Sequence, residues 1–171
     1  MLDITGRKDS AYPLGWPNDD ACVCDYREYW GRAASKYDEK SGTLSISYTA
    51  TSNIAWFAYF APYTIDRHHD LIAEVSSIEG ISCRTIGYSL EVQAIDCLEM
   101  GEGRKQIWHY ARQHPGESMV EWLMEGALDM ICDHADQVVR LVKKKRRFHI
   151  KTKLIPDGWF GGTCRTTYAD Q

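Results

Sequence analysis

The sequence predicts an α/β protein in two parts, an antiparallel sheet followed by a sheet with parallel pairs whose strands alternate with helices. Three observations support this fold class. Segments rich in Tyr, Trp, Thr and Ile, separated by turn residues, occupy residues 23–60. A proline-containing break follows at residues 61–63. Beyond the break, strand-like segments alternate with helical periodicity to about residue 155, which is typical of a sheet with parallel pairs.

The composition is that of a globular chain without a basic field. Of the 171 residues, 44% are hydrophobic, enough to form one ordinary domain or two small ones. The formal net charge is -4, so neither nucleic acid nor an anionic membrane is expected as the main partner. Because the sequence shows no signal-like N-terminus and no run of about 18 apolar residues, a cytoplasmic location is expected. The oligomeric state is not indicated.

Six cysteines are scattered along the chain and include one C-x-C but no C-x-x-C. They are Cys22, Cys24, Cys83, Cys97, Cys132 and Cys164. This spacing favours neither a zinc ribbon nor a thioredoxin-like site, so most are expected to be small apolar residues with reduced thiols.

The first part is expected to form three antiparallel strands after a loop. Met1–Asp20 is rich in Gly, Pro, Asp and Asn and is predicted to be turn or loop. Strands are expected at Val23–Trp30, Gly42–Tyr48 and Ile54–Phe60. Residues 43–48 alternate polar and apolar, which indicates a strand with one buried face.

The second part begins near Pro62, so domains are expected at residues 1–62 and 63–171. Apolar residues recur at helical spacing over Ile65–Val75. The remaining elements are expected to be strands at Ile81–Tyr88, Gln93–Met100, Lys105–Ala111 and Phe148–Ile155, with helices ending near Cys132 and spanning Gln137–Lys144. Cap residues for the latter helix lie within Asp133–Asp136.

One stretch, Arg112–Met119, carries the strongest functional signal. Pro115 suits the first position of a helix, which places His114 at the N-cap and Glu117 at N3. An imidazole and a carboxylate three residues apart across such a turn can meet at one zinc ion. The alternative is that Glu117 simply caps the helix by reaching back to the N-cap amide.

Other candidate residues have plainer interpretations. The basic run Lys143–Arg147 lies in the predicted last turn of a helix, where cations offset the helix dipole, and no aromatic residues interleave with it as in a nucleic-acid interface. His68 and His69 are expected to be surface or core residues rather than metal ligands. Glu121 and Glu125 are expected to lie along the surface of the helix that begins in Arg112–Met119, which we call the site helix, and away from its N-terminal end.

The stretch Arg112–Met124, RQHPGESMVEWLM, resembles the metal-binding segment of zinc metallocarboxypeptidases related to carboxypeptidase A. The resemblance is to the cytosolic carboxypeptidase or deglutamylase branch and its bacterial relatives. Tyr59–Tyr63 resembles the join between the two domains of that branch. The resemblance implies a partial N-terminal antiparallel β-sandwich followed by the first half of an α/β/α zinc carboxypeptidase domain. It also implies that His114 and Glu117 are two of three zinc ligands.

A second motif near the C-terminus resembles the same family. Ile155–Thr167 matches the family segment N-P-D-G-x-x-x-G-x-x-R-x-N, except that Ile155 and Thr167 stand where Asn is usual. The positions in register are Pro156, Asp157, Gly158, Gly162 and Arg165. The resemblance implies that Arg165 polarises the scissile carbonyl of the substrate.

The resemblance therefore implies a zinc-dependent carboxypeptidase acting on the C-terminal tail of a peptide or protein, with glutamate as the residue that the branch removes. In the family, the third zinc ligand and the general-base Glu lie further downstream, so we expect a fragment that is inactive alone. The alternative is a non-catalytic binding or scaffold protein on a decayed or truncated carboxypeptidase fold. Metal content distinguishes the two.

Overall fold

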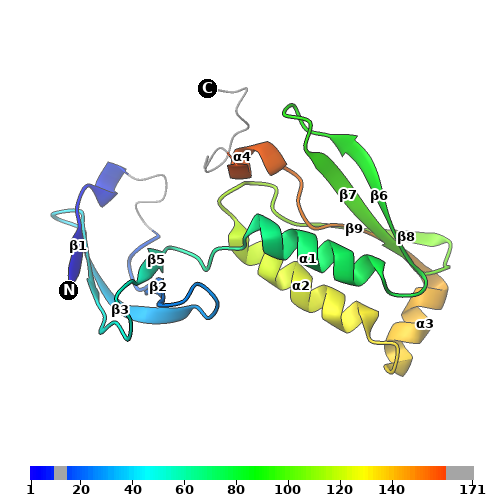
Figure 1. The fold of residues 1–171 in the computed structure, drawn as a ribbon, viewed down its shortest axis with the longest axis horizontal. Helices are drawn as coiled ribbons and strands as arrows, with labels where there is room; N and C mark the ends of the chain where they lie inside the picture. Colours follow the sequence, from blue (N-terminus) through cyan, green and yellow to red (C-terminus); the bar gives the residue numbers. More distant parts are fainter. Residues whose placement is uncertain (10–14, 161–171) are drawn as a thin grey trace. The chain divides into compact units, whose positions relative to one another are not determined.

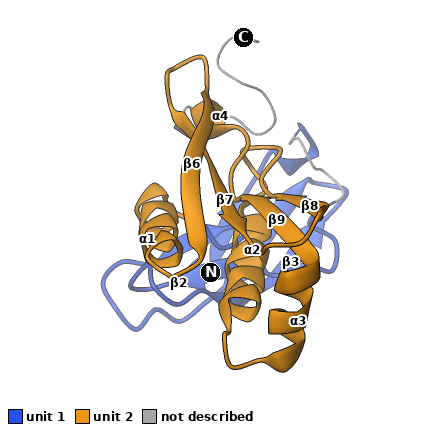
Figure 2. Cartoon of the chain, turned by 90° about the vertical axis from the view of Figure 1, so that its right-hand side faces the viewer, with its two compact units in different colours: residues 1–62 blue, residues 63–171 orange. Residues whose placement is uncertain are grey.

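The computed structural model describes residues 1–9 and 15–160. The chain divides into two compact units, Met1–Pro62 and Tyr63–Gln171 (Figure 2). The division falls at the proline that interrupts the β pattern of the sequence. Within the described residues, no helix combines the length and the apolar character needed to cross a bilayer.

The described part of the first unit is an antiparallel sheet with a short 3-10 turn, η1 (Arg7–Asp9). Its strands are β1 (Leu2–Ile4), β2 (Ala21–Cys24), β3 (Gly31–Asp38), β4 (Thr43–Ser47) and β5 (Trp56–Ala58) (Figure 1). They lie in the order β1-β4-β3-β2-β5. Every pair of neighbours is antiparallel.

The alternation predicted for residues 43–48 is confirmed. Leu44 and Ile46 on β4 are 0% and 2% exposed, whereas Ser47 is exposed. Both apolar side chains pack in a cluster with Ala33 and Val23 of the neighbouring strands. One face of this sheet therefore carries the core of the unit, as the period of two requires.

Two strands of this sheet were not predicted. Leu2–Ile4, expected to be loop, forms β1, and Leu2 pairs with Ile46. Gly31–Asp38 forms β3, between β2 and β4. Ala33 is its one buried residue. Strand β1 is only three residues long and β3 has a single buried residue, so neither segment stands out in the sequence as a strand. Both are held by backbone pairing with β4.

The strand predicted for Val23–Trp30 ends at Cys24 because Asp25 anchors a bend. The Asp25 carboxylate accepts hydrogen bonds from the Tyr48 hydroxyl at 3.0 Å and the Thr51 amide at 2.9 Å. Arg27 then adopts the left-handed region with φ 62°, which breaks an extended strand. The strand predicted for Ile54–Phe60 is likewise shorter, spanning only β5.

The described part of the second unit combines helices with a mixed sheet (Figure 1). The helices are α1 (Ile65–Ser76), α2 (Ser118–Cys132), α3 (Gln137–Lys145) and α4 (Pro156–Phe160). The strands are β6 (Ile81–Tyr88), β7 (Ala94–Met100), β8 (Lys105–Tyr110) and β9 (Arg146–Lys151).

The sheet of this unit has the order β6-β7-β9-β8, so β9 lies between two strands that precede it in the chain. The pairs β6–β7 and β7–β9 are antiparallel, while β8 and β9 are parallel and are connected through α2 and α3. The expected alternation of strands and helices with a parallel pair is therefore confirmed.

The core of the second unit lies between α1, α2 and one face of the sheet. In Figure 1, α1 and α2 run side by side. Leu71 of α1 and Leu128 of α2 pack with Leu98 of β7 and Ile150 of β9 in one buried cluster. Residues that alternate with the latter two, such as Glu99 and His149, point to the opposite face of the sheet.

The cap of α3 is as predicted, but the strand after it has other bounds. Asp136 caps α3 as expected, accepting from the Val138 and Val139 amides. The strand predicted for Phe148–Ile155 is instead β9, which begins at Arg146. The basic run Lys143–Arg147 is therefore divided between the last turn of α3 and the start of β9, rather than lying wholly in a helix.

The described cysteines are free thiols: Cys22, Cys24, Cys83, Cys97 and Cys132. Cys22, Cys24 and Cys97 are buried, as expected for small apolar residues. Burial raises the pKa of the Cys97 thiol.

Substitution of glycine by alanine should have opposite effects on stability at two positions. A Cβ at Gly103 would lie 1.9 Å from the backbone carbon of Lys145, whereas a Cβ at Gly126, in α2, would meet nothing within 4 Å. Gly103→Ala should lower the free energy of unfolding by at least about 1–3 kcal/mol, the usual cost of overpacking. Gly126→Ala should raise it by up to about 1 kcal/mol because alanine favours helix. Urea denaturation followed by circular dichroism measures both, and equal stability of the two variants would contradict this packing.

Candidate active site

The candidate site begins where β8 ends. Ala111 continues the pairing with β9 by one further hydrogen bond, from its amide to the Lys151 carbonyl at 2.9 Å. Arg112 then takes a left-handed conformation with φ 48°. A turn follows, closed by a hydrogen bond from the Glu117 amide to the His114 carbonyl at 3.0 Å. Residues 113–116 form this turn, which we call the site turn.

The predicted start of the site helix is wrong. Helix α2 begins at Ser118 with Glu117 as its N-cap, and the Glu117 side chain makes no capping bond within the helix. Pro115 lies buried in the site turn rather than at the first helical position. The fixed φ of proline suits a turn as well as a helix start, so the sequence did not discriminate between them.

His114 and Glu117 nevertheless come together. His114 Nδ1 lies 2.7 Å from Glu117 Oε1, and the backbone amide of His114 donates to Glu117 Oε2 at 3.2 Å. Their side chains are 44% and 33% exposed, so solvent reaches both. The structure therefore contains the convergent pair and also the reach-back contact of the alternative interpretation, although that contact forms across a turn.

The Arg112 side chain lies beneath the site turn, where it is 4% exposed. Its Nε donates to the Pro115 carbonyl at 2.8 Å. A terminal nitrogen of the same guanidinium donates to the Tyr63 carbonyl at 3.3 Å and to the carboxylate of Glu121. Arg112 thus joins the site turn, the start of the unit and α2.

Glu121 does not lie on the helix surface, as the sequence suggested, but is 1% exposed. One carboxylate oxygen pairs with Arg112, and the other lies 3.5 Å from His68 Nδ1. His68 is 3% exposed, and its Nδ1 also lies 3.3 Å from the Thr152 hydroxyl, just after β9. His68 is therefore a core residue, whereas the neighbouring His69 is exposed.

Glu125, one turn further along α2, has different partners. It accepts hydrogen bonds from Arg67 Nε at 2.9 Å and from the Tyr63 hydroxyl at 2.6 Å. These contacts, Arg67 first, lower the pKa of Glu125. The carboxylates of both glutamates of α2 are therefore engaged by arginines, Glu121 by Arg112 and Glu125 by Arg67.

Part of the second motif has a structural role. Asp157 of α4 is 1% exposed. It accepts hydrogen bonds from the Ser89 hydroxyl and, at 3.2 Å, from the Glu91 amide. Asp157 therefore fastens the β6–β7 turn to the segment after β9. Arg165, the residue that the sequence assigned to the substrate carbonyl, lies outside the described residues, as do Gly162 and Thr167.

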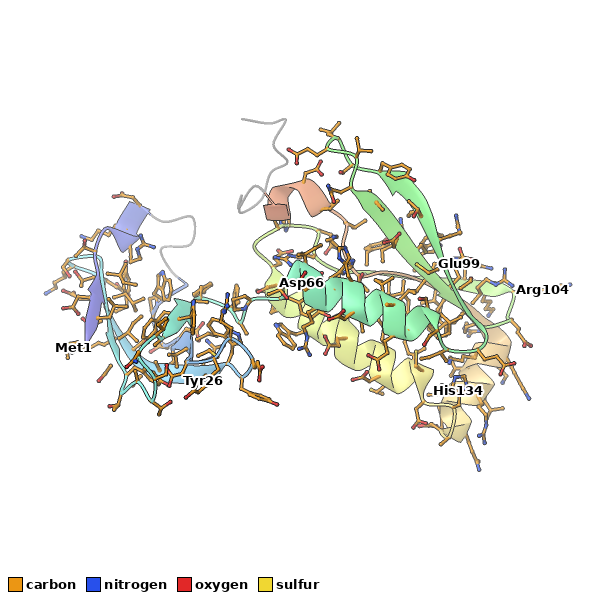
Figure 3. All side chains as sticks on the ribbon, viewed as in Figure 1. Met1, Tyr26, Asp66, Glu99, Arg104 and His134 are labelled. Atoms are coloured by element: carbon orange, nitrogen blue, oxygen red, sulfur yellow. The ribbon has the colours of Figure 1, made fainter. Side chains whose placement is uncertain are left out.

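A separate group of metal-ligand types lies on the opposite face of the sheet. Cys97, Glu99 and His149 place their ligand atoms within 4.8 Å of one another (Figure 3 labels Glu99). Glu99, however, accepts from Arg84 at 2.7 Å, and His149 contacts Glu99 at 3.1 Å and Gln106 through its other nitrogen. Glu99 and His149 therefore already have polar partners on neighbouring strands, as in a cross-strand network of side chains.

Comparison with known proteins agrees with this fold. Residues 1–60 match the family described as the cytosolic carboxypeptidase N-terminal domain. A metallo-carboxypeptidase from Burkholderia cenocepacia superposes with a TM-score of 0.91 at 32% identity, covering 98% of this chain and 46% of that one. A metallo-carboxypeptidase from Pseudomonas aeruginosa gives 0.90 at 29% identity, covering 100% of this chain and 47% of that one.

Sequence relatives indicate the same class. An uncharacterized protein of Zymomonas mobilis is 51% identical over 165 residues, covering 96% of this chain and 43% of that protein. Human cytosolic carboxypeptidase 4 is 25% identical over 174 residues, covering 87% of this chain and 16% of that protein. The chain thus spans less than half the length of these relatives.

The chain is therefore a relative of the metallo-carboxypeptidases, and the predicted fold class is confirmed. Its first 60 residues match the N-terminal domain of the cytosolic carboxypeptidases, the branch that the sequence motifs resembled.

The buried Lys153, just after β9, predicts a pH dependence of stability. The side chain is 6% exposed. Burial lowers its pKa to about 8; Glu121, Asp96 and Asp157 oppose this shift, and Arg112 reinforces it. The unfolded chain, with an ordinary lysine pKa of about 10.4, binds the proton more tightly. Stability should therefore rise between about pH 8 and pH 10.4, by up to about 1.4 kcal/mol per pH unit from this group.

Urea denaturation at several pH values across this window measures the slope. Lys153→Met should flatten it, while Lys144→Met, at an exposed position of α3, should leave it unchanged. The same slope in the wild type and in Lys153→Met would show that Lys153 does not titrate in this way.

Proposed function

We propose that this chain forms part of a zinc-dependent metallocarboxypeptidase in which His114 and Glu117 are two of the metal ligands. The observation that carries the proposal is the 2.7 Å approach of His114 Nδ1 to Glu117 Oε1 on a solvent-accessible turn. The similarity of the chain to metallo-carboxypeptidases supports a carboxypeptidase-like function with a bound metal.

The donor set fits zinc. A neutral imidazole nitrogen and a carboxylate oxygen are both common ligands of this ion. The two atoms share a hydrogen bond here, so a metal would replace the proton between them. The site turn also follows the carboxyl end of β8, a parallel strand, which is where ligands bind in open α/β sheets.

Zinc at this position supplies Lewis acidity and lowers the pKa of a bound water toward about 7. The chain's own contribution would be to hold the ion on the site turn through one neutral and one negative ligand. Arg165 is proposed to hold the carbonyl oxygen of the scissile bond, as the family motif implies. The third ligand and the general base are proposed to come from residues beyond this chain.

The proposed substrate is the C-terminal tail of a peptide or protein, with glutamate as the residue removed. The deglutamylase resemblance supports this choice. We propose a cytoplasmic location, in keeping with the names of the cytosolic relatives, and no nucleic-acid or membrane partner.

Zinc uptake by the purified chain tests the site. In equilibrium dialysis the wild-type chain should retain zinc with modest affinity, because stable protein zinc sites normally have three or four protein ligands. His114→Ala should abolish retention, and Glu117→Gln should weaken it by removing the ligand's negative charge.

His134→Ala is the matched control, because His134 is an exposed histidine in the loop between α2 and α3. It should retain zinc like the wild type. Equal retention by the wild type and His114→Ala would contradict the assignment and favour the alternative of a binding or scaffold protein without a catalytic metal.

A further inference from the structure

Arg112 makes contacts whose arrangement suggests more than a role in stability. Its Nε bonds to the carbonyl of Pro115, which lies between the two proposed ligands in sequence. One terminal nitrogen of the guanidinium donates both to the Tyr63 carbonyl at the start of the unit and to the Glu121 carboxylate on α2. One planar guanidinium therefore fixes the middle of the site turn to two elements of the core, a task for which its rigid fork is suited.

The backbone of Arg112 is also unusual. With φ 48° it lies in the left-handed region, where a residue with a Cβ is disfavoured by roughly 1 kcal/mol or more. Such conformations persist where the surroundings over-determine them, and they cluster at functional sites. Here Arg112 lies between the end of β8 and the site turn, and its side chain binds the Pro115 carbonyl of that turn.

Glu121 completes the arrangement by balancing the buried charge. Arg112 and Glu121 are 4% and 1% exposed, and a buried ion pair of this kind gives little net stability compared with apolar packing. Removing either partner leaves an uncompensated charge in the interior. The pair therefore contributes more to fixing the geometry of its neighbours than to the free energy of unfolding.

We propose that Arg112, held in place by Glu121, is a positioning residue that sets the site turn so that His114 Nδ1 and Glu117 Oε1 face one point. The proposal rests on the metal-binding role proposed above. Neither Arg112 nor Glu121 contacts the metal in this scheme. The Arg112 side chain is bound to the Pro115 carbonyl, and the Glu121 carboxylate is bound to Arg112.

Zinc affinity is the first test. Arg112→Lys keeps the positive charge but cannot reach the Pro115 carbonyl and the Glu121 carboxylate with one fork. Loss of residues that orient metal ligands typically weakens metal binding by about 10–100-fold. We expect a loss of this size for Arg112→Lys and a loss in the same direction for Glu121→Gln, both measured by competition with a chromophoric chelator.

Glu125→Gln is the matched control. Glu125 lies one turn further along the same helix, and the substitution also removes an ion pair with an arginine, but its partners are Arg67 and Tyr63 rather than Arg112. We expect it to lower thermal stability without changing zinc affinity. If Arg112→Lys does not fold, the isosteric Glu121→Gln carries the test.

Amide hydrogen exchange supplies a readout that does not depend on metal. The Glu117 amide is protected by its bond to the His114 carbonyl. Relative to the Leu128 amide in the core, it should exchange at least about tenfold faster in Arg112→Lys and Glu121→Gln but not in Glu125→Gln.

The two arms separate the possible failures. Wild-type zinc affinity in both Arg112→Lys and Glu121→Gln, with zinc lost in His114→Ala, would overturn the positioning role and leave the proposed function intact. If the wild type takes up no zinc, the proposed function fails. Hydrogen exchange then decides whether Arg112 holds the site turn, and unchanged protection of the Glu117 amide in Arg112→Lys and Glu121→Gln would overturn the positioning role.

Discussion

The parallel pairing of β8 with β9 is the constraint on which the candidate site depends. Parallel neighbours end at the same edge of a sheet, so the residues after Tyr110 and the residues after Lys151 must emerge together. The site turn follows the first strand, and Thr152, Lys153 and Asp157 follow the other. Residues that lie some 40 positions apart in the chain are thereby gathered at one edge without any long-range signal in the sequence itself.

Four charged residue types are buried near this edge of the sheet. Arg112, Glu121, Lys153 and Asp157 are each less than a tenth exposed. Ionised groups are costly to bury unless each has partners, and here the partners are distributed over several elements: Tyr63 at the start of the unit, α2, and the β6–β7 turn. These buried residues therefore link separate elements to one another. The His114–Glu117 pair is more exposed to solvent than they are.

The sequence predicted those features that depend on local periodicity. The alternation at residues 43–48, the helix at residues 65–75 and the β6–β7 hairpin all follow from a period of two or 3.6. The approach of His114 to Glu117 follows from their spacing across a turn. Strand β3 could not be predicted because Ala33 is its one buried residue, and the start of α2 could not because proline suits both a turn and a helix start.

The Arg112–Glu121 pair escaped prediction for a different reason. The two residues are nine positions apart, across a strand end, a turn and the first turn of a helix, and no periodic rule relates positions in three kinds of structure. Their partnership depends on the left-handed backbone of Arg112, which a bulky residue seldom adopts. One available signal was a glutamate on α2 in line with the apolar residues Met124 and Leu128, which marks a face turned to the core.

The strand order β6-β7-β9-β8 has a consequence for how the second unit is made. Strands β7 and β8 are consecutive in the chain but are separated in the sheet by β9. During synthesis on the ribosome, the edges of β7 and β8 that pair with β9 therefore stay unpaired until residue 151 has emerged. Exposed edges of this kind invite pairing with other chains. Strand β9, which is synthesised last, completes the sheet by pairing with both of them. Nascent chains that stop before β9 should therefore depend most on chaperones.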